Sequence, residues 1–279
     1  KEWGAELIYG DLILPETIPP CLKGITAIID ASTTRPNDLT AMKKIDWEGK
    51  LALIEAAKAA NIKHFIFCSA LNVEQFSSIP LMQMKKGIEI YLKKSDITFT
   101  IFRLTGFYQA LIQQYAIPIL ESFPIWITNE KISISYIDTQ DIARFCIRAL
   151  QLSKAKNKVF ILGGPKSWLS FDIIKLCEKL AGQSANVNQI PIFILKLFTN
   201  IIGYFEWGQN ISDRLRFVEI LNSENSFSNS IFHLYDIFKI DKNEILKLED
   251  YFLEYFIRLL KRLKDINFED IQKQKNLIL

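Results

Sequence analysis

The stretch Lys63-His64-Phe65-Ile66-Phe67-Cys68-Ser69 decides the fold, together with the segment 80–94 that follows it. The first stretch has almost no polar interruption, which is typical of a strand that a parallel sheet covers on both faces. Pro80 stands near the expected start of a helix, where a missing backbone N–H costs nothing. A buried strand followed by a helix is the repeating unit of a parallel sheet, and we expect the same unit on both sides of this stretch.

The alternation continues through the N-terminal part of the chain. We therefore predict an α/β fold, with a Rossmann-type parallel sheet in residues 1–165 and a mainly helical C-terminal subdomain in residues 166–279. The expected strands are 6–9, 26–30, 63–68, 99–104, 132–137 and 158–162. The expected helices are 15–23, 42–60, 80–94, 107–121, 138–150, 170–182, 211–221, 231–238 and 242–264, with a frayed tail after Asn267. We expect Asp138, Asp141 and Ser170 to cap helix starts and Gly182 to end a helix.

The composition excludes several classes of function. The chain has 279 residues, of which 49% are hydrophobic and 23% charged, so it can bury a large core. A net charge of +3 is too small for this length to indicate a nucleic-acid partner. Its four cysteines lie far apart and it has only two histidines, so we expect reduced, buried thiols and no metal site. No uninterrupted apolar run approaches the ~18 residues that a membrane span needs.

A Rossmann fold binds the pyrophosphate of its cofactor with a glycine-rich turn after the first strand. This sequence contains no such turn, and the stretch 6–9 ends in Gly10-Asp11-Leu12, which is typical of a later strand. We therefore expect the phosphate loop to lie before Lys1. Asp11, with Leu12 beside it, is a candidate to accept a hydrogen bond from an adenine amino group. The alternative for Asp11 is a helix cap or a turn.

Two further segments follow predicted strands at their carboxyl ends, where open α/β sheets bind ligands. Ala31, Ser32 and Thr33 are small enough for a ribose to approach the backbone. Thr105-Gly106-Phe107 offers a close backbone approach at the glycine and an aromatic ring that could flank a nicotinamide. An ordinary tight turn remains the alternative for the first segment, and structural packing for the second.

Ser69 and Lys85 form the most specific pair of candidate residues. A serine after a strand and a lysine on the next helix resemble the active site of a short-chain dehydrogenase. There the serine polarises a carbonyl, while the lysine holds the ribose and lowers the pKa of a tyrosine four residues before it. Leu81 occupies that tyrosine position, so we expect no general acid by this route. Lys85 is still a candidate for binding a ribose, with a solvated surface lysine as the alternative.

The C-terminal part contains an unusually apolar stretch at 191–205 and a basic amphipathic helix at 242–264. Both indicate a face that docks a membrane surface or a partner protein. The candidate residues for this face are Phe193, Phe198, Tyr204, Phe205 and Trp207. The alternative is that the two segments pack on each other and on the sheet.

Several strings resemble the NmrA-like atypical short-chain dehydrogenases, and more narrowly their cyanobacterial and plastid members that act as photosystem II assembly factors. The general strings are Gly10-Asp11-Leu12, Asp30-Ala31, Ile45-Asp46-Trp47-Glu48-Gly49-Lys50, Lys85 with Glu89, and Thr100-Ile101-Phe102-Arg103-Leu104. The narrower strings are Lys1-Glu2-Trp3-Gly4-Ala5-Glu6-Leu7, Tyr136-Ile137-Asp138-Thr139-Gln140-Asp141-Ile142-Ala143, Phe205-Glu206-Trp207 and Asn210-Ile211-Ser212-Asp213-Arg214-Leu215. The resemblance covers nearly all of residues 1–265.

The resemblance implies a protein of the plastid stroma, bound peripherally to the thylakoid membrane. It implies photosystem II reaction-centre subunits, chlorophyll synthase and small high-light-inducible membrane proteins as partners, and help in delivering chlorophyll. NADP(H) is the implied cofactor, although its binding is weakened or lost without the glycine-rich loop. Three hypotheses follow: a non-catalytic assembly factor, an NADPH-dependent reductase of an isoprenoid or chlorin substrate, and a sensor that responds to NADP(H).

Overall fold

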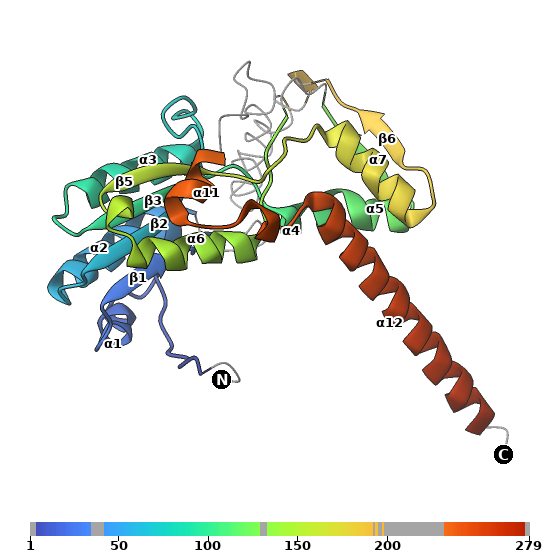
Figure 1. Ribbon diagram of the computed structural model, residues 1–279, viewed down its shortest axis with the longest axis horizontal. Coiled ribbons are helices and arrows are strands. Elements are labelled where there is room, and N and C mark those ends of the chain that lie inside the picture. The colour runs from blue at the N-terminus through green and yellow to red at the C-terminus, as the bar shows by residue number, and fades with distance from the viewer. Residues whose placement is uncertain are drawn as a thin grey trace.

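The computed structural model describes residues 4–34, 42–128, 133–191, 193–194, 197 and 232–276, with the side chains of α12 described as far as Arg262. Its centre is a parallel sheet of four strands in the order β1-β2-β3-β5 (Figure 1). These strands are β1 (Ala27–Asp30), β2 (His64–Ala70), β3 (Phe99–Leu104) and β5 (Lys158–Leu162). The register sets Asp30 opposite Phe67 and Ser69 opposite Arg103. The carboxyl ends of all four strands therefore meet at one edge of the sheet.

Helices account for most of the remaining described chain. They are α1 (Ile18–Cys21), α2 (Lys50–Ala59), α3 (Pro80–Lys93), α4 (Tyr108–Leu111), α5 (Ile117–Leu120), α6 (Thr139–Gln151), α7 (Ser170–Ala181), α11 (Phe232–Phe238) and α12 (Leu248–Asn276). Single π-helical segments at Lys44–Gly49 and Ile112–Ala116 lead into α2 and α5, and 3₁₀ turns lie at Pro15–Thr17, Ser153–Ala155 and Lys242–Glu244. The predicted strand–helix alternation is thus confirmed for the sheet.

Both faces of the sheet are covered, as the apolar run in β2 predicts. Side chains at alternate positions of a strand point to opposite faces. Phe65 and Phe67 of β2 pack in one core with Ile54 and Ala57 of α2, Ile88 and Leu92 of α3 and Ile101 of β3. Ile66 and Cys68 pack in a second core with Phe102 of β3, Phe145 and Cys146 of α6 and Phe238 of α11. Packing on both faces therefore fixes the position of the carboxyl edge of the sheet.

A second group of elements lies beside the sheet. A two-stranded parallel sheet pairs β4 (Pro124–Ile127) with β6 (Asn186–Gln189). Its buried Ile125 shares a core with side chains of α4, α5 and α7 and with Leu248, Phe252 and Phe256 of α12. Beyond this core α12 continues away from the body of the molecule (Figure 1).

Helix ends follow the sequence signals in part. The Asp138 side chain accepts a hydrogen bond from the backbone N–H of Gln140, and Gly182 ends α7 with a positive φ of 69°, as predicted. The capping roles of Asp141 and Ser170 are wrong. The Asp141 carboxylate accepts hydrogen bonds from the Leu246 N–H and from Arg144, and the Ser170 hydroxyl bonds the Tyr115 hydroxyl instead. Both side chains find tertiary partners that local spacing does not reveal.

Three other local predictions are wrong. Residues 6–9 form no strand, because no described strand lies beside them to complete the backbone hydrogen bonds, and Leu7 and Tyr9 are exposed. In the predicted strand 132–137, the described residues make only isolated bridges at Ile134 and Ile137. The tail after Asn267, predicted to be frayed, belongs to α12, which is helical to Asn276. The helix predicted at 211–221 lies outside the described residues.

Candidate functional site

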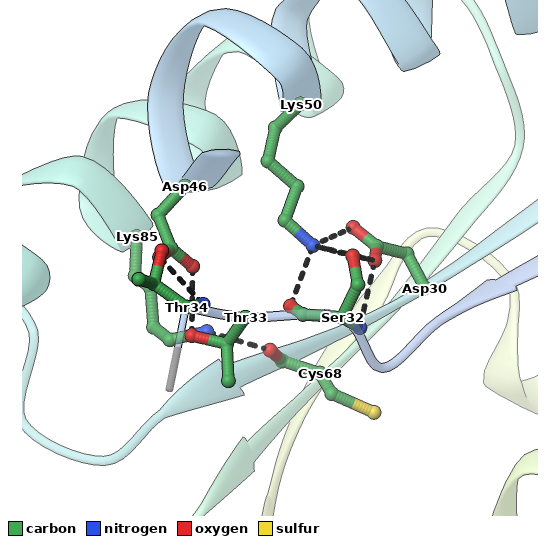
Figure 2. Close-up of polar contacts among 8 residues, drawn as sticks. All are labelled: Asp30, Ser32, Thr33, Thr34, Asp46, Lys50, Cys68 and Lys85. Atoms are coloured by element: carbon green, nitrogen blue, oxygen red, sulfur yellow. Dashed lines mark hydrogen bonds and ion pairs between the residues drawn. The ribbon is translucent and has the colours of Figure 1, made fainter. Parts of the chain in front are cut away.

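The carboxyl end of β1 holds a buried ion pair. The Lys50 Nζ lies 2.5 Å from Asp30 Oδ1 and 2.6 Å from Asp30 Oδ2, and both side chains are almost fully buried (Figure 2). Lys50 also donates to the backbone carbonyl of Ser32 at 2.7 Å and to its hydroxyl at 2.6 Å. The Ser32 hydroxyl in turn donates to Asp30 Oδ1 at 2.7 Å. All the polar atoms of this cluster are therefore engaged with one another, as a buried charge requires.

A second buried carboxylate fixes the residues that follow. Asp46 accepts hydrogen bonds from the Thr33 hydroxyl at 2.8 Å, the Thr34 backbone N–H at 3.0 Å and the Thr34 hydroxyl at 2.6 Å (Figure 2). Asp46 and Lys50 are four residues apart on the helical segment that leads into α2, so they point the same way. Together they pin the backbone of residues 30–34, while the side chains of Ala31, Ser32 and Thr33 stay exposed at the edge.

Lys85 points into the same region from α3. Its Nζ donates to the backbone carbonyl of Cys68 at 3.1 Å and lies 5.3 Å from the centre of the Phe67 ring (Figure 2). Burial lowers the pKa of Lys85, because an ammonium group loses its hydration there, and the positive charge of Lys50 lowers it further. The solvated surface lysine considered as the alternative is therefore wrong for Lys85.

Ser69, near the end of β2, has a different hydrogen-bond partner from Lys85. Its hydroxyl donates to Glu89 Oε1 at 2.6 Å. Glu89 also accepts from Arg103 at 2.7 and 3.0 Å and pairs with Lys93 at 3.3 Å. Arg103 reaches further to Glu74 at 2.5 Å. Ser69 thus belongs to a charged network on α3 and β3, separate from the bonds that Lys85 makes.

Leu81 lies in the first turn of α3 and is buried, with 6% of its surface exposed. No hydroxyl group stands at this position of the helix. Tyr91, farther along α3, packs against the first core and donates to the Glu55 carboxylate at 2.7 Å. Neither residue provides a proton donor next to Ser69 and Lys85.

The ends of the neighbouring strands complete the edge. The Thr105 hydroxyl donates to the Ser135 carbonyl, and the Gly106 carbonyl accepts a hydrogen bond from the Ile137 N–H. An added Cβ at Gly106 would stand 2.7 Å from the Tyr136 ring, so the glycine permits the close approach of that ring. Phe107 is partly exposed at the start of α4. These contacts favour the packing alternative for Thr105 and Gly106 and leave the Phe107 ring accessible.

Asp11 and Leu12 form a turn beside the helical segment that carries Asp46 and Lys50. Asp11 accepts a hydrogen bond from the Ile13 N–H at 2.9 Å and closes a turn in which its backbone carbonyl bonds Leu14. Leu12 packs closely against Gly49, where a Cβ would stand 2.6 Å from the Leu12 carbonyl oxygen. The turn alternative for Asp11 therefore accounts for its side chain.

The sequence analysis did not select Lys50, Asp46 and Glu89 as site residues. The structure shows that they bind the other polar groups of this edge. A signal was present in the spacing of Asp46 and Lys50, which puts two opposite charges on one face of a helix next to a buried strand. Glu89 is four residues after Lys85 and on the same helix face.

The predicted docking face is described only in part. Phe193 is exposed over 69% of its surface, whereas Phe198, Tyr204, Phe205 and Trp207 lie outside the described residues. Another apolar surface is seen on α12, where Leu253, Ile257 and Leu260 are exposed and lie on one side of the helix. We call these three residues the α12 stripe. Within the described residues no helix is both long and apolar enough to span a membrane, and no three side chains gather as metal ligands.

A family model described as the NmrA-like family matches residues 1–252. The chain belongs to the NmrA-like family. Curated relatives cover nearly all of it. "Photosystem II assembly factor Ycf39" of Trieres chinensis is 69% identical over 100% of this chain and 88% of its own length. The protein of the same name from Synechocystis is 40% identical, over 96% of this chain and 82% of its own length.

The Arabidopsis thaliana protein "High chlorophyll fluorescence phenotype 244, chloroplastic" is 40% identical over 98% of this chain and 68% of its own length. Among solved structures, the Citrobacter triphenylmethane reductase complexed with NADP(H) superposes with a TM-score of 0.69 at 17% identity, over 91% of this chain and 85% of its own. This likeness shows that the NmrA-like chain has the fold of nucleotide-dependent reductases, and at this identity it shows the fold alone.

Proposed function

We propose that this NmrA-like protein is a photosystem II assembly factor, a non-catalytic scaffold that aids reaction-centre assembly and chlorophyll delivery. The observation that carries the proposal is the identity of 40 to 69% with proteins named for this role, over at least 96% of the chain.

The carboxyl edge of the sheet supports the non-catalytic part of the proposal. Carbonyl reduction needs a proton donor beside the reacting oxygen. The buried Leu81 offers none. The Ser69 hydroxyl donates a hydrogen bond to Glu89, and the Lys85 ammonium donates one to the Cys68 carbonyl. The three groups that would perform the chemistry are therefore apolar or already bonded to the protein.

NADP(H), when bound, supplies a hydride to reductases of this fold, and we propose that here it serves at most as a structural ligand. The exposed, backbone-pinned segment Ala31–Thr33 and the accessible Phe107 ring fit a ribose and a flat ring at the edge. The Lys85 ammonium has three N–H donors and gives one to the Cys68 carbonyl, which leaves donors for a ribose. The residues fit nucleotide binding at the edge better than they fit hydride transfer.

We propose further that the protein works in the plastid stroma on the thylakoid surface. Its partners there would be reaction-centre subunits, chlorophyll synthase and high-light-inducible-type membrane proteins. The chloroplastic relative supports the compartment. The exposed Phe193 and the α12 stripe support docking, because apolar side chains gathered on a projecting helix lower their free energy by binding a partner. The α12 stripe would receive an apolar helix of a membrane protein.

The test is affinity isolation of the tagged protein from solubilised thylakoids, with partners identified by mass spectrometry and pigments measured in the eluate. Reaction-centre subunits and chlorophyll in the eluate are expected. In parallel, NADPH oxidation is measured with chlorophyll precursors present. Turnover that disappears in Lys85→Ala would contradict the scaffold and favour a reductase, while an eluate without reaction-centre subunits would contradict the assembly role.

A further inference from the structure

A groove runs along one face of the first turns of α12, away from the α12 stripe. Its volume is about 290 Å³, and it is lined by Tyr251, Tyr255, Arg258, Leu259 and Arg262. Spacings of three, four and seven residues put these side chains above one another on a helix. The groove therefore presents two phenols, two guanidinium groups and one aliphatic side chain to the same small volume.

The two phenols are held in place by aromatic contacts. The Tyr251 ring lies 5.4 Å from that of Tyr108, and the Tyr255 ring lies 5.7 Å from that of Phe256 in an edge-to-face arrangement. Burial raises the pKa of both tyrosines, so their hydroxyls stay protonated at neutral pH and can donate. In the described part of the chain neither hydroxyl has a hydrogen-bond partner.

The guanidinium groups make one end of the groove positive. Arg258 pairs with Glu254 at 2.6 Å, whereas Arg262 has no acidic partner among the described side chains. Two like charges four residues apart destabilise a helix slightly, so a bound anion would relieve a repulsion as well as form new bonds. The negative charges of Asp138 and Glu254 act on Tyr251, which lies at the other end. The groove is thus polarised along its length, with the cationic end at Arg262.

We propose that this groove binds the phosphate-bearing end of a small amphiphile. Arg262 and Arg258 would hold the phosphate oxygens, because a guanidinium fork matches a phosphate in shape and charge. The Tyr255 hydroxyl would donate to the same headgroup, and Leu259 would contact its apolar part. A volume of about 290 Å³ is at the low end for a ligand pocket, so it admits a headgroup and leaves acyl chains outside.

This site does not rest on the proposed function, since it is assigned from the groove alone. Binding of the whole protein to soluble dihexanoyl-phosphatidylglycerol is measured by calorimetry, with inorganic phosphate as a competitor. Binding to vesicles of phosphatidylcholine with and without phosphatidylglycerol is measured by flotation. The variant is Arg262→Gln, and its matched control is Lys261→Gln, which removes the same charge one residue away and outside the groove.

Arg262→Gln is expected to weaken binding of the soluble lipid about tenfold, as for a lost hydrogen bond between charged groups, and Lys261→Gln to leave it unchanged. Tyr255→Phe keeps the ring and is expected to weaken binding about threefold. All three variants change side chains that reach the surface, and thermal unfolding checks that they fold.

Loss of vesicle binding in Arg262→Gln alone would support the site and identify a membrane lipid as its ligand. Binding of the soluble lipid that phosphate displaces, without vesicle binding, would support the site and identify a soluble phosphate ester. Equal losses in Arg262→Gln and Lys261→Gln would reveal unspecific attraction between charges and overturn the proposal. No binding of either lipid form by the unaltered protein would also overturn it.

Discussion

Charged side chains at the carboxyl edge of the sheet are buried, whereas those described on the helix α12 are largely exposed. At the edge, Lys50 and Asp30 are buried and paired with each other, and the buried Asp46 is hydrogen-bonded to Thr34. On α12, Arg258 and Arg262 face solvent beside an open groove, and the α12 stripe is exposed. The first region has the contacts of a structural core, whereas the second carries charged and apolar side chains that a partner can reach.

The largest expected effect comes from breaking the buried ion pair. Lys50→Met leaves the Asp30 carboxylate buried without a cation, and we expect the free energy of unfolding to fall by about 3–5 kcal/mol. The exposed pair of Lys58 with Glu55 provides the control. Lys58→Met should lower the free energy by no more than about 0.5 kcal/mol. Urea unfolding followed by circular dichroism compares them, and equal losses would mean that the edge does not depend on this pair.

A tyrosine placed where the dehydrogenase acid would stand should not restore chemistry. Leu81→Tyr forces a larger side chain into a buried site, and we expect it to destabilise the protein by about 1–3 kcal/mol. Because Ser69 and Lys85 remain bonded elsewhere, no NADPH oxidation should appear in a spectrophotometric assay with quinones or chlorin precursors. Tyr91→Phe, which keeps the ring against the first core and removes only the hydroxyl that bonds Glu55, is the control for stability. Steady NADPH oxidation by Leu81→Tyr would contradict a non-catalytic edge.

The buried Lys85 should make stability depend on pH. Its pKa in the folded protein is below the ordinary lysine value of 10.5, so between the lowered pKa and 10.5 the unfolded chain binds more protons than the folded one. Stability contributed by this group therefore rises with pH through that window, by up to about 1.4 kcal/mol per pH unit, and is flat below it. Subtracting the unfolding free energies of Lys85→Met from those of the unaltered protein between pH 7 and 10 measures this slope. A difference that does not change with pH would show that Lys85 is not desolvated.

The smallest effect on stability is expected on α12. Changing Leu253 and Leu260 of the α12 stripe to Gln should alter the free energy of unfolding by no more than about 0.5 kcal/mol per site, because these side chains are already exposed. The same double variant should lose reaction-centre subunits in affinity isolation from thylakoids. Ile147→Gln, an equally exposed apolar residue on α6, is the matched control. Retention of the partners by the double variant would exclude the α12 stripe as the docking surface.

The sequence predicted the central sheet well because its strands are buried on both faces. The mostly apolar runs at 63–68 and 99–104 are typical of strands, and β3 has the predicted bounds. It missed β4 and β6, since Asn186–Gln189 is short and mostly polar and carries no periodic signal. It also placed a strand at 6–9, where an apolar pattern exists without a described neighbour to pair with.

For the candidate site, the sequence pointed to the right edge and to Leu81 as the missing acid. It did not reveal that Ser69 bonds Glu89 while Lys85 bonds the backbone carbonyl of Cys68, because these partners depend on how α3 packs against β2. Whether NADP(H) binds there, and whether Phe193 and its undescribed neighbours form a docking face, stay predictions.

The amino-acid sequence alone determined the α/β architecture, the family resemblance and the leucine at position 81, because periodicity and residue identity are local properties of the chain. The tertiary structure alone decided that Lys50 neutralises Asp30 across twenty residues and that Asp141 bonds Leu246 across more than a hundred. It also decided that Arg258 and Arg262 share a groove with two tyrosines. Such pairings depend on how the helices pack on the sheet. Burial there removes water, so each polar group needs a partner within the protein. Packing brings that partner close, even from a distant part of the chain.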